Sequence, residues 1–187
     1  MDVDGVILNF QEGLRSVLFD KRILFNINAV RTYNYDGDIG CDKKLIFNEF
    51  TNPELYKRAP YLDNAILGLV TLNEVAFTHA YTGSVSSRPI AKMRESLCNE
   101  LPFDAYTLFV GEHKGTKLSN DETLNKELLP DVVFDDCPAV IDMWCKTDIP
   151  YVYVIDAPYN RNCGGRCIRA NSFYEAVLDY KARIENE

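Results

Sequence analysis

The feature that most constrains the fold is a regular alternation of strand-like and helix-like segments in the second half of the chain. Runs rich in β-branched and aromatic residues predict strands at 74–82, 105–111, 131–136 and 151–155. Amphipathic segments predict helices at 86–101, 119–129, 138–147 and 172–187. Strands that alternate with helices form a parallel sheet, because each crossover is long enough to hold a helix. The pattern therefore predicts a doubly wound α/β fold, which binds ligands at the carboxyl ends of its strands.

Helix starts in this half of the chain carry local sequence signals. Ser119 with Glu122, and Ser172 with Glu175, have the spacing of capping boxes, in which side chains satisfy the first backbone N–H groups of a helix. Ser87 is the predicted N-cap of the helix at 86–101. Local signals and periodicity therefore agree on where these helices begin.

The first part of the chain differs, because helix-like segments dominate it. The predicted helices lie at 10–22, 51–59 and 61–74. Thr51 is the predicted N-cap of the second of them. About sixty residues separate the opening DVDG from the first clear strand, and a direct crossover needs far fewer. We therefore expect a small helical cap at 15–60, inserted after the first strand of a core formed by 1–14 and 61–187.

The composition favours one compact domain and argues against several classes of partner. The chain has 187 residues, 47% of them hydrophobic, and a formal net charge of −8. Proteins that bind polynucleotides usually present a basic field, so this charge argues against DNA or RNA as the main ligand. The sequence has no apolar run of about 18 residues and no secretion signal at its start. We expect a cytoplasmic protein with a small-molecule partner, and a homodimer is compatible with this interpretation.

The six cysteines occur mostly in apolar or helical contexts, which is typical of reduced thiols. The stretch CGGRC brings Cys163 near Cys167, but a zinc site needs two further ligands. We interpret it as a loop with two free thiols, or with a disulfide, rather than as a metal site. Arg161, Arg166 and Arg169 lie in the same region, and we favour a solvated basic loop over contact with a substrate.

The carboxyl ends of the predicted strands carry acids, a hydroxyl, a glycine and lysines. In chain order these residues are Asp2, Asp4, Thr82, Gly83, Lys114, Lys117, Asp135 and Asp136. Phosphoryl transfer through an aspartyl-phosphate requires a carboxylate nucleophile and a hard cation such as Mg²⁺. It also requires a hydroxyl and an ammonium to hold the phosphoryl oxygens. A second acid protonates the leaving alkoxide and then activates water. The predicted strand ends supply each of these groups.

The order of these motifs resembles that of phosphatases of the haloacid dehalogenase superfamily, from residue 2 to residue 136. Within that superfamily the chain is similar to the 5′(3′)-deoxyribonucleotidase group. The similar stretches are DVDGVILNFQEG, RAPYLDNA, LFVGEHK, VVFDDCP and DAPYNR. The resemblance implies a Rossmann-like core with a helical cap, and Mg²⁺-dependent hydrolysis of nucleoside monophosphates to nucleoside and phosphate.

The resemblance also implies a role for each matched position. Asp2 is then the nucleophile, and Asp4 is the general acid and base. Thr82 binds the phosphate, with the Gly83 amide nearby. The implied Mg²⁺ site comprises Asp2, the backbone carbonyl of Asp4, Asp135 and Asp136.

Two further sets of residues follow from the resemblance. The lysine that neutralises charge on the phosphoryl group is Lys114, with Lys117 as the competing position. The cap supplies the pocket for the base, and the aromatic residues available for stacking are Phe10, Tyr33, Tyr35, Phe47 and Phe50.

The sequence departs from the family pattern at its start, because only Met1 precedes Asp2. A central strand contributes about 1.5–3 kcal/mol for each apolar side chain that it buries, so this start is expected to weaken the sheet. One alternative is therefore a non-catalytic protein that binds Mg²⁺ or a nucleotide on the same fold. Another is a phosphatase for a different small phosphomonoester, such as a sugar phosphate. A response-regulator receiver places its acids in another order, and the GxxxxGK[ST] motif of a P-loop enzyme is absent.

Overall fold

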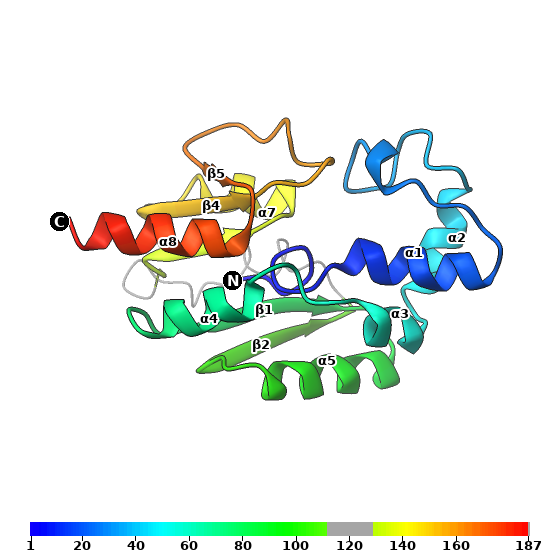
Figure 1. Cartoon of the computed structure of the whole chain (residues 1–187), viewed down its shortest axis with the longest axis horizontal. Helices are drawn as coiled ribbons and strands as arrows, with labels where there is room; N and C mark the ends of the chain where they lie inside the picture. Colours follow the sequence, from blue (N-terminus) through cyan, green and yellow to red (C-terminus); the bar gives the residue numbers. More distant parts are fainter. Residues whose placement is uncertain (112–128, 187) are drawn as a thin grey trace.

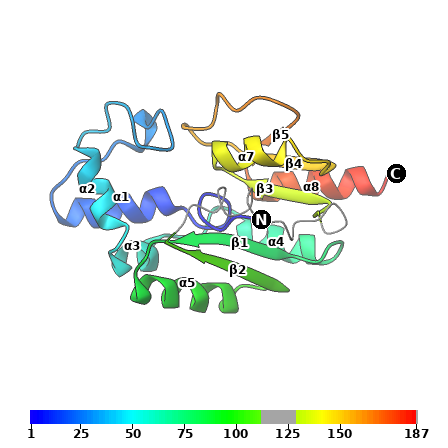
Figure 2. The same ribbon diagram turned by 180° about the vertical axis from the view of Figure 1, so that it is seen from behind.

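The computed structural model describes residues 1–111 and 129–186, which form a mixed α/β structure with two small parallel sheets (Figure 1, Figure 2). Their strands are β1 (His79–Ser84) and β2 (Ala105–Val110) in the first sheet, and β3 (Val132–Asp135), β4 (Tyr151–Ile155) and β5 (Ile168–Ala170) in the second. Neighbouring strands within each sheet run parallel, as the alternation of strands and helices predicts.

Helices precede, connect and follow these strands. They are α1 (Phe10–Asp20), the 3-10 helix η1 (Ile27–Ala29), α2 (Lys43–Glu49), α3 (Pro53–Arg58), α4 (Ala65–Asn73), α5 (Arg88–Glu100), α7 (Pro138–Trp144) and α8 (Phe173–Ile184). In Figure 1, α1, η1, α2 and α3 lie to one side of the sheets, and α4, α5, α7 and α8 pack around the strands.

The second sheet is covered on both faces by helices. Successive side chains of a strand point in opposite directions, so neighbouring residues of β3 join different cores. Val133 belongs to a buried cluster with Trp144 of α7. Phe134 packs edge-on against Phe173 of α8, with ring centroids 5.1 Å apart. The near-continuous apolar sequence VVF of β3 is explained by this two-sided burial.

The first residues of the chain lie between the two sheets (Figure 1). On the β1 side, the Met1 amino group donates to the His79 carbonyl at 2.7 Å, and Tyr81 N donates to the Met1 carbonyl at 2.7 Å. On the β3 side, Asp2 N donates to the Phe134 carbonyl at 2.9 Å. The segment thus links β1 to β3 through backbone hydrogen bonds, and Asp2 lies at the point of contact.

The helical segment at 10–58 has a buried cluster of its own. Its members are Leu14, Val17, Leu18, Phe25, Val30, Tyr35, Ile39, Ile46 and Leu55. Helices α1 and α3 approach closely at Gly13, where an added Cβ would lie 2.5 Å from the Leu55 carbonyl oxygen. The segment overlaps most of the predicted cap, although α1 runs across the predicted boundary after residue 14.

Two of the predicted helix starts can be compared directly with the structure. The Ser172 hydroxyl accepts a hydrogen bond from Glu175 N at 3.2 Å, which confirms this N-cap. The prediction of Thr51 as the N-cap of α3 is wrong: the Asn52 side chain accepts from Glu54 N at 3.1 Å. Pro53 then occupies the first turn, so the helix begins one residue later than predicted.

Other boundaries also differ from the predictions. Strand β1 begins at His79 rather than at residue 74, because the chain after α4 turns before it enters the sheet. Ser87 is the residue before α5, but its side chain makes no capping hydrogen bond. Periodicity failed to predict α2 and β5, which are 7 and 3 residues long and too short for a clear pattern. The capping box at Ser119 and Glu122 lies outside the described residues.

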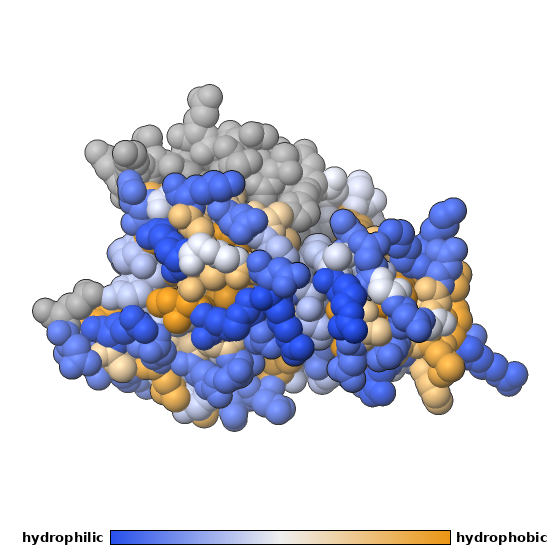
Figure 3. All heavy atoms as spheres, turned by 90° about the horizontal axis from the view of Figure 1, so that it is seen from above, coloured by the Kyte–Doolittle hydropathy of each residue, from blue (hydrophilic) through white to orange (hydrophobic). Residues whose placement is uncertain are grey.

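In the part of the chain that the structure describes, no helix combines the length and apolar character needed to cross a bilayer. On the face shown in Figure 3, hydrophilic residues predominate and hydrophobic residues form small groups between them.

Candidate active site

Three buried carboxylates meet where the N-terminal segment reaches the end of β3. Asp2, Asp135 and Asp136 are each 4% exposed, and each offers an oxygen within 4.8 Å of the others. Backbone groups hold two of them: Val3 N donates to Asp2 Oδ1 at 2.7 Å, and Cys137 N donates to Asp135 Oδ1 at 2.8 Å. Sequence analysis placed these acids at strand ends, and the structure brings them together.

This carboxylate cluster has the chemistry of a site for a divalent cation. Like charges this close and this buried are unfavourable unless a cation or protons neutralise them. Carboxylate oxygens are hard ligands that suit Mg²⁺, which also retains water molecules. Among the described residues, this is the one group of three or more acidic, histidine or cysteine side chains with ligand spacing. Asp2, Asp135 and Asp136 are therefore the residues that would hold Mg²⁺.

Gly5 allows the DVDG loop to pass directly over Asp136. Its φ of +73° lies in the left-handed region, and an added Cβ would lie 2.0 Å from Asp136 Oδ2. A larger residue would have to displace the carboxylate or the loop. The glycine of the motif is thus required by the approach of Asp136 as well as by the turn itself.

The loop after β4 contributes contacts to Asp136 that sequence reasoning did not assign. The Tyr159 hydroxyl donates to Asp136 Oδ2, and Asn160 Nδ2 donates to the Asp136 carbonyl at 2.9 Å. Burial and the Asp136 charge raise the pKa of Tyr159 well above its ordinary value, so the hydroxyl remains a donor. The stretch DAPYNR was recognised only as part of the resemblance, and its tyrosine and asparagine orient an acid of the cluster.

A cavity of about 1060 Å³ lies between the carboxylates and the helical segment. Its wall includes Asp2, Asp4 and Asp136. The aromatic residues that line it are Phe10, Tyr33, Tyr35, Phe47, Phe50, Tyr56, Tyr61, Tyr159 and Phe173. The predicted stacking residues Phe10, Tyr33 and Phe47 are thus brought to one cavity. Its volume is at the upper end of the range for sites that bind small molecules.

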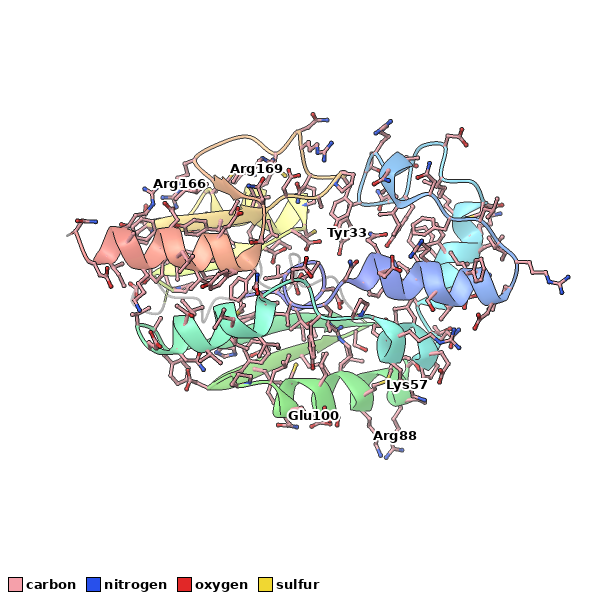
Figure 4. All side chains as sticks on the ribbon, in the orientation of Figure 1. Tyr33, Lys57, Arg88, Glu100, Arg166 and Arg169 are labelled. Carbon is pink, nitrogen blue, oxygen red and sulfur yellow. The ribbon has the colours of Figure 1, made fainter. Side chains whose placement is uncertain are left out.

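Tyr33 and Tyr159 connect the helical segment with the loop after β4. Their rings meet edge to face, with centroids 5.7 Å apart. In Figure 4, Tyr33 lies between the two parts of the molecule. This aromatic contact places a π surface next to Asp136, because Tyr159 also donates to that carboxylate.

The residues at the end of β1 differ in whether they line the cavity. Thr82, the predicted phosphate-binding hydroxyl, is fully buried and is not part of the cavity wall. The neighbouring Gly83 and Ser84 do line the cavity, as does Ser86. An added Cβ at Gly83 would meet no atom within 4 Å. Gly83 and Ser84 are therefore the residues of β1 that border the cavity, and the Ser84 hydroxyl donates to the Val85 carbonyl at 3.1 Å.

Sequence reasoning missed Arg94, which lies beneath the end of β1. Its side chain is 1% exposed; Nη1 donates to Asp4 Oδ1 at 2.6 Å, and Nη2 donates to the Thr82 hydroxyl. Burial acts to lower the pKa of the guanidinium, but the charges of Asp4 and Asp2, the hydrogen bond to Asp4 and the contact with Tyr56 together raise it above its ordinary value. A sequence signal exists: Ile90, Arg94 and Cys98 are spaced by four and share the buried face of α5.

Three further residues were predicted to belong to the site: Asp4, Lys114 and Lys117. Lys114 and Lys117 lie outside the described residues. The carboxylate of Asp4 is not a member of the carboxylate cluster. The resemblance predicts that Asp4 contacts the metal through its backbone carbonyl, and this contact stays a prediction.

The basic and thiol-containing residues lie in the loop after β4 and in β5, next to Tyr159 and Asn160, which contact Asp136. Arg166 donates to the Cys145 carbonyl at 3.1 Å, and Arg169 donates to Asp156 Oδ1 at 2.7 Å and to Asn160 Oδ1 at 3.0 Å. Figure 4 shows both arginines on the upper part of the molecule, around β5. All six cysteines are free thiols. The arginines therefore hold the loop that carries Asn160, rather than forming only a solvated basic surface.

Two comparisons with known proteins give no match. No protein-family model matches the chain, and no curated protein matches it. The geometry of the site is therefore the basis for assigning a function.

Proposed function

We propose that this protein is a Mg²⁺-dependent phosphomonoesterase that acts through an aspartyl-phosphate, with nucleoside monophosphates as its substrates. The observation that carries the proposal is the carboxylate cluster of Asp2, Asp135 and Asp136 beside an aromatic-lined cavity. Like charges gathered in a buried position are typical of functional sites, and three buried carboxylates lie within ligand distance of one another here. The same proposal includes membership in the haloacid dehalogenase superfamily.

The chemistry assigns different work to the two acids of the DVDG loop. Asp2 attacks phosphorus and forms the acyl phosphate, while the bond to the leaving alkoxide breaks. Asp4, which lines the cavity, gives its proton to that alkoxide. In the second half of the reaction Asp4 takes a proton from water, which attacks the acyl phosphate and restores the Asp2 carboxylate. The net reaction converts a phosphomonoester and water to an alcohol and phosphate.

The remaining groups would neutralise the negative charge of the substrate and orient its phosphoryl group. A bound Mg²⁺ supplies positive charge that allows an anionic nucleophile and an anionic substrate to approach. Asp135 and Asp136 would hold it, with Tyr159 orienting Asp136. Gly83 and Ser84 line the cavity and would contact the phosphoryl oxygens, with the Ser84 hydroxyl turning from the Val85 carbonyl to do so; Lys114 is proposed to neutralise the phosphoryl charge.

The aromatic wall favours nucleotides over sugar phosphates. Planar bases stack on aromatic side chains, and Phe10, Tyr33 and Phe47 supply such surfaces in the same cavity as the acids. A sugar phosphate would leave much of this wall without a partner. We therefore propose that the segment at 15–60 acts as a cap that selects the base, over a doubly wound core linked through the N-terminal residues. Free thiols agree with a reducing compartment such as the cytoplasm.

The test is phosphate release from a panel of nucleoside and deoxynucleoside monophosphates and sugar phosphates, with Mg²⁺ and with EDTA. Mg²⁺-dependent release, strongest from the nucleotides, is the expected result. Release mainly from sugar phosphates would support the proposed reaction but contradict nucleoside monophosphates as the substrates. A folded protein that binds Mg²⁺ or nucleotide but releases no phosphate would overturn the enzymatic proposal in favour of a binding protein.

A further inference from the structure

Arg94 connects two segments that face each other across the site. It extends from α5, and its Nη1 reaches Asp4, which lies 90 residues away in the chain. Its Nη2 reaches Thr82 near the end of β1. One planar guanidinium therefore bridges the DVDG loop and the strand whose end lines the cavity.

Stability alone is a weak reason for this arrangement. A buried ion pair gains little over well-packed apolar residues, because both charges lose their hydration. The Arg94 Nε adds to this cost, since it is buried and has no hydrogen-bond partner among the described residues. An apolar side chain at this position of α5 would satisfy packing between Ile90 and Cys98 without either penalty.

The hydrogen bonds define what Arg94 does to each partner. It engages one oxygen of the Asp4 carboxylate, whose side chain is 30% exposed and lines the cavity. At Thr82 the hydroxyl oxygen accepts from the guanidinium, so its own hydrogen must point away from Arg94. Thr82 is thereby fixed within β1, and Gly83 and Ser84 follow it directly into the cavity wall.

A contact with the helical segment completes the surroundings of the guanidinium. Its central carbon lies 5.6 Å from the centre of the Tyr56 ring, which belongs to α3. Tyr56 also lines the cavity. The Arg94 side chain thus has a charged partner, a hydroxyl partner and an aromatic face, and little freedom to move.

We propose that Arg94 is a positioning residue that keeps Asp4 aligned with the end of β1. Asp4 and the cavity-lining residues Gly83 and Ser84 then act on one substrate from fixed positions. The proposal rests on the phosphatase function proposed above. A misplacement of about 1 Å at such a site can cost about a hundredfold in rate, so Arg94 affects turnover without touching the substrate.

The experiment compares Arg94→Ala, Arg94→Lys and Arg88→Ala in steady-state kinetics with the best nucleotide of the panel. Arg88 begins the same helix, is exposed, and points away from the molecule in Figure 4. We expect Arg94→Ala to lower kcat about a hundredfold with KM changed less than about threefold. Arg94→Lys should lose about tenfold, because an ammonium does not reproduce the fork of two donors. Arg88→Ala should retain wild-type kcat and KM.

Chemical rescue separates positioning from general loss of structure. Guanidinium chloride at a non-denaturing concentration should restore part of the kcat of Arg94→Ala, and equal concentrations of sodium chloride or urea should not. Thermal unfolding in parallel identifies variants that fail to fold, and Arg94→Lys then decides the question. Wild-type kcat in folded Arg94→Lys, or a loss in Arg94→Ala that no guanidinium restores, would overturn the proposal.

A double variant tests whether Arg94 acts through Thr82. Thr82→Val keeps the shape of the side chain and removes the hydroxyl, so Arg94→Lys should cost less in that background than in the wild type. If Arg94→Lys lowers kcat by the same factor in the Thr82→Val background as in the wild type, Arg94 does not act through Thr82. If the folded wild type shows no turnover, the phosphatase function fails and this proposal fails with it. Normal wild-type turnover with unaffected Arg94 variants contradicts the positioning role alone.

Discussion

Two cavities lie at opposite ends of the strands, and their walls differ. The cavity at the carboxyl ends has about 1060 Å³ and presents Asp2, Asp4 and Asp136. The cavity at the amino ends has about 470 Å³, and Thr78, His79, Asp131 and Asp135 supply the polar part of its wall. Both walls are largely apolar, so the two cavities differ chiefly in the acids that they present. Of the clustered carboxylates, Asp135 borders the second cavity.

The difference shows that groups unfavourable for stability are concentrated at the carboxyl ends of the strands. At the carboxyl ends, loops provide backbone N–H groups that hold acids, as Val3 N does for Asp2. At the amino ends, the same strands are covered by helices, and Leu72 of α4 is 3% exposed. Substitutions at the carboxyl ends should therefore change turnover, whereas those at the amino ends should change stability.

The largest expected effect comes from the proposed nucleophile. Asp2→Asn removes the attacking charge and should lower turnover by about 10³-fold or more. Asp131→Asn is the matched control, because Asp131 is exposed and borders the cavity at the amino ends. Phosphate release measured on both variants checks the comparison. Substantial turnover in Asp2→Asn contradicts the assignment of the nucleophile.

Gly5→Ala should damage both turnover and stability. The new Cβ meets Asp136 and the residue is held at positive φ, so we expect a loss of about 4 kcal/mol in the free energy of unfolding. Gly164→Ala is the control, since its Cβ would meet no atom within 4 Å and Gly164 does not line the cavity. Urea unfolding measures both. A Gly5→Ala protein as stable and active as the wild type would show that the loop moves away at little cost.

Leu72→Ala should separate stability from function. Removing a buried side chain at the amino ends should lower the free energy of unfolding by about 3 kcal/mol, and kcat should stay unchanged below the unfolding transition. Denaturant titration and steady-state kinetics on the same preparation provide the measurement. A large loss of kcat in the folded variant would show that the two ends are coupled.

Mg²⁺ should stabilise the carboxyl ends. At a free concentration of about 100 times Kd, a cation that binds only the folded protein adds about 2.7 kcal/mol to the free energy of unfolding. Thermal unfolding with Mg²⁺ and with EDTA should show this shift. Asp136→Asn should reduce it and, in EDTA, should unfold no earlier than the wild type, because repulsion within the carboxylate cluster falls. A full Mg²⁺ shift in Asp136→Asn would place the cation elsewhere.

Much of the architecture follows from local pattern. Strand β4 occurs at 151–155, as the sequence predicts, because its apolar run is bounded clearly on both sides. The acids at the ends of the predicted strands were found because parallel strands end at a common edge. Short elements such as β5 were missed, since three residues carry too little periodicity.

The sequence by itself determined the parallel α/β class, the helical segment and the acids available to the site, because these depend on residue type and spacing. Tertiary structure decided which side chains meet: Arg94 with Asp4, Tyr159 with Asp136, and Thr82 behind the cavity wall. The physical reason is distance along the chain. Periodicity reports the face of one element, whereas the Arg94–Asp4 pair spans 90 residues and exists only after α5 has packed beneath β1.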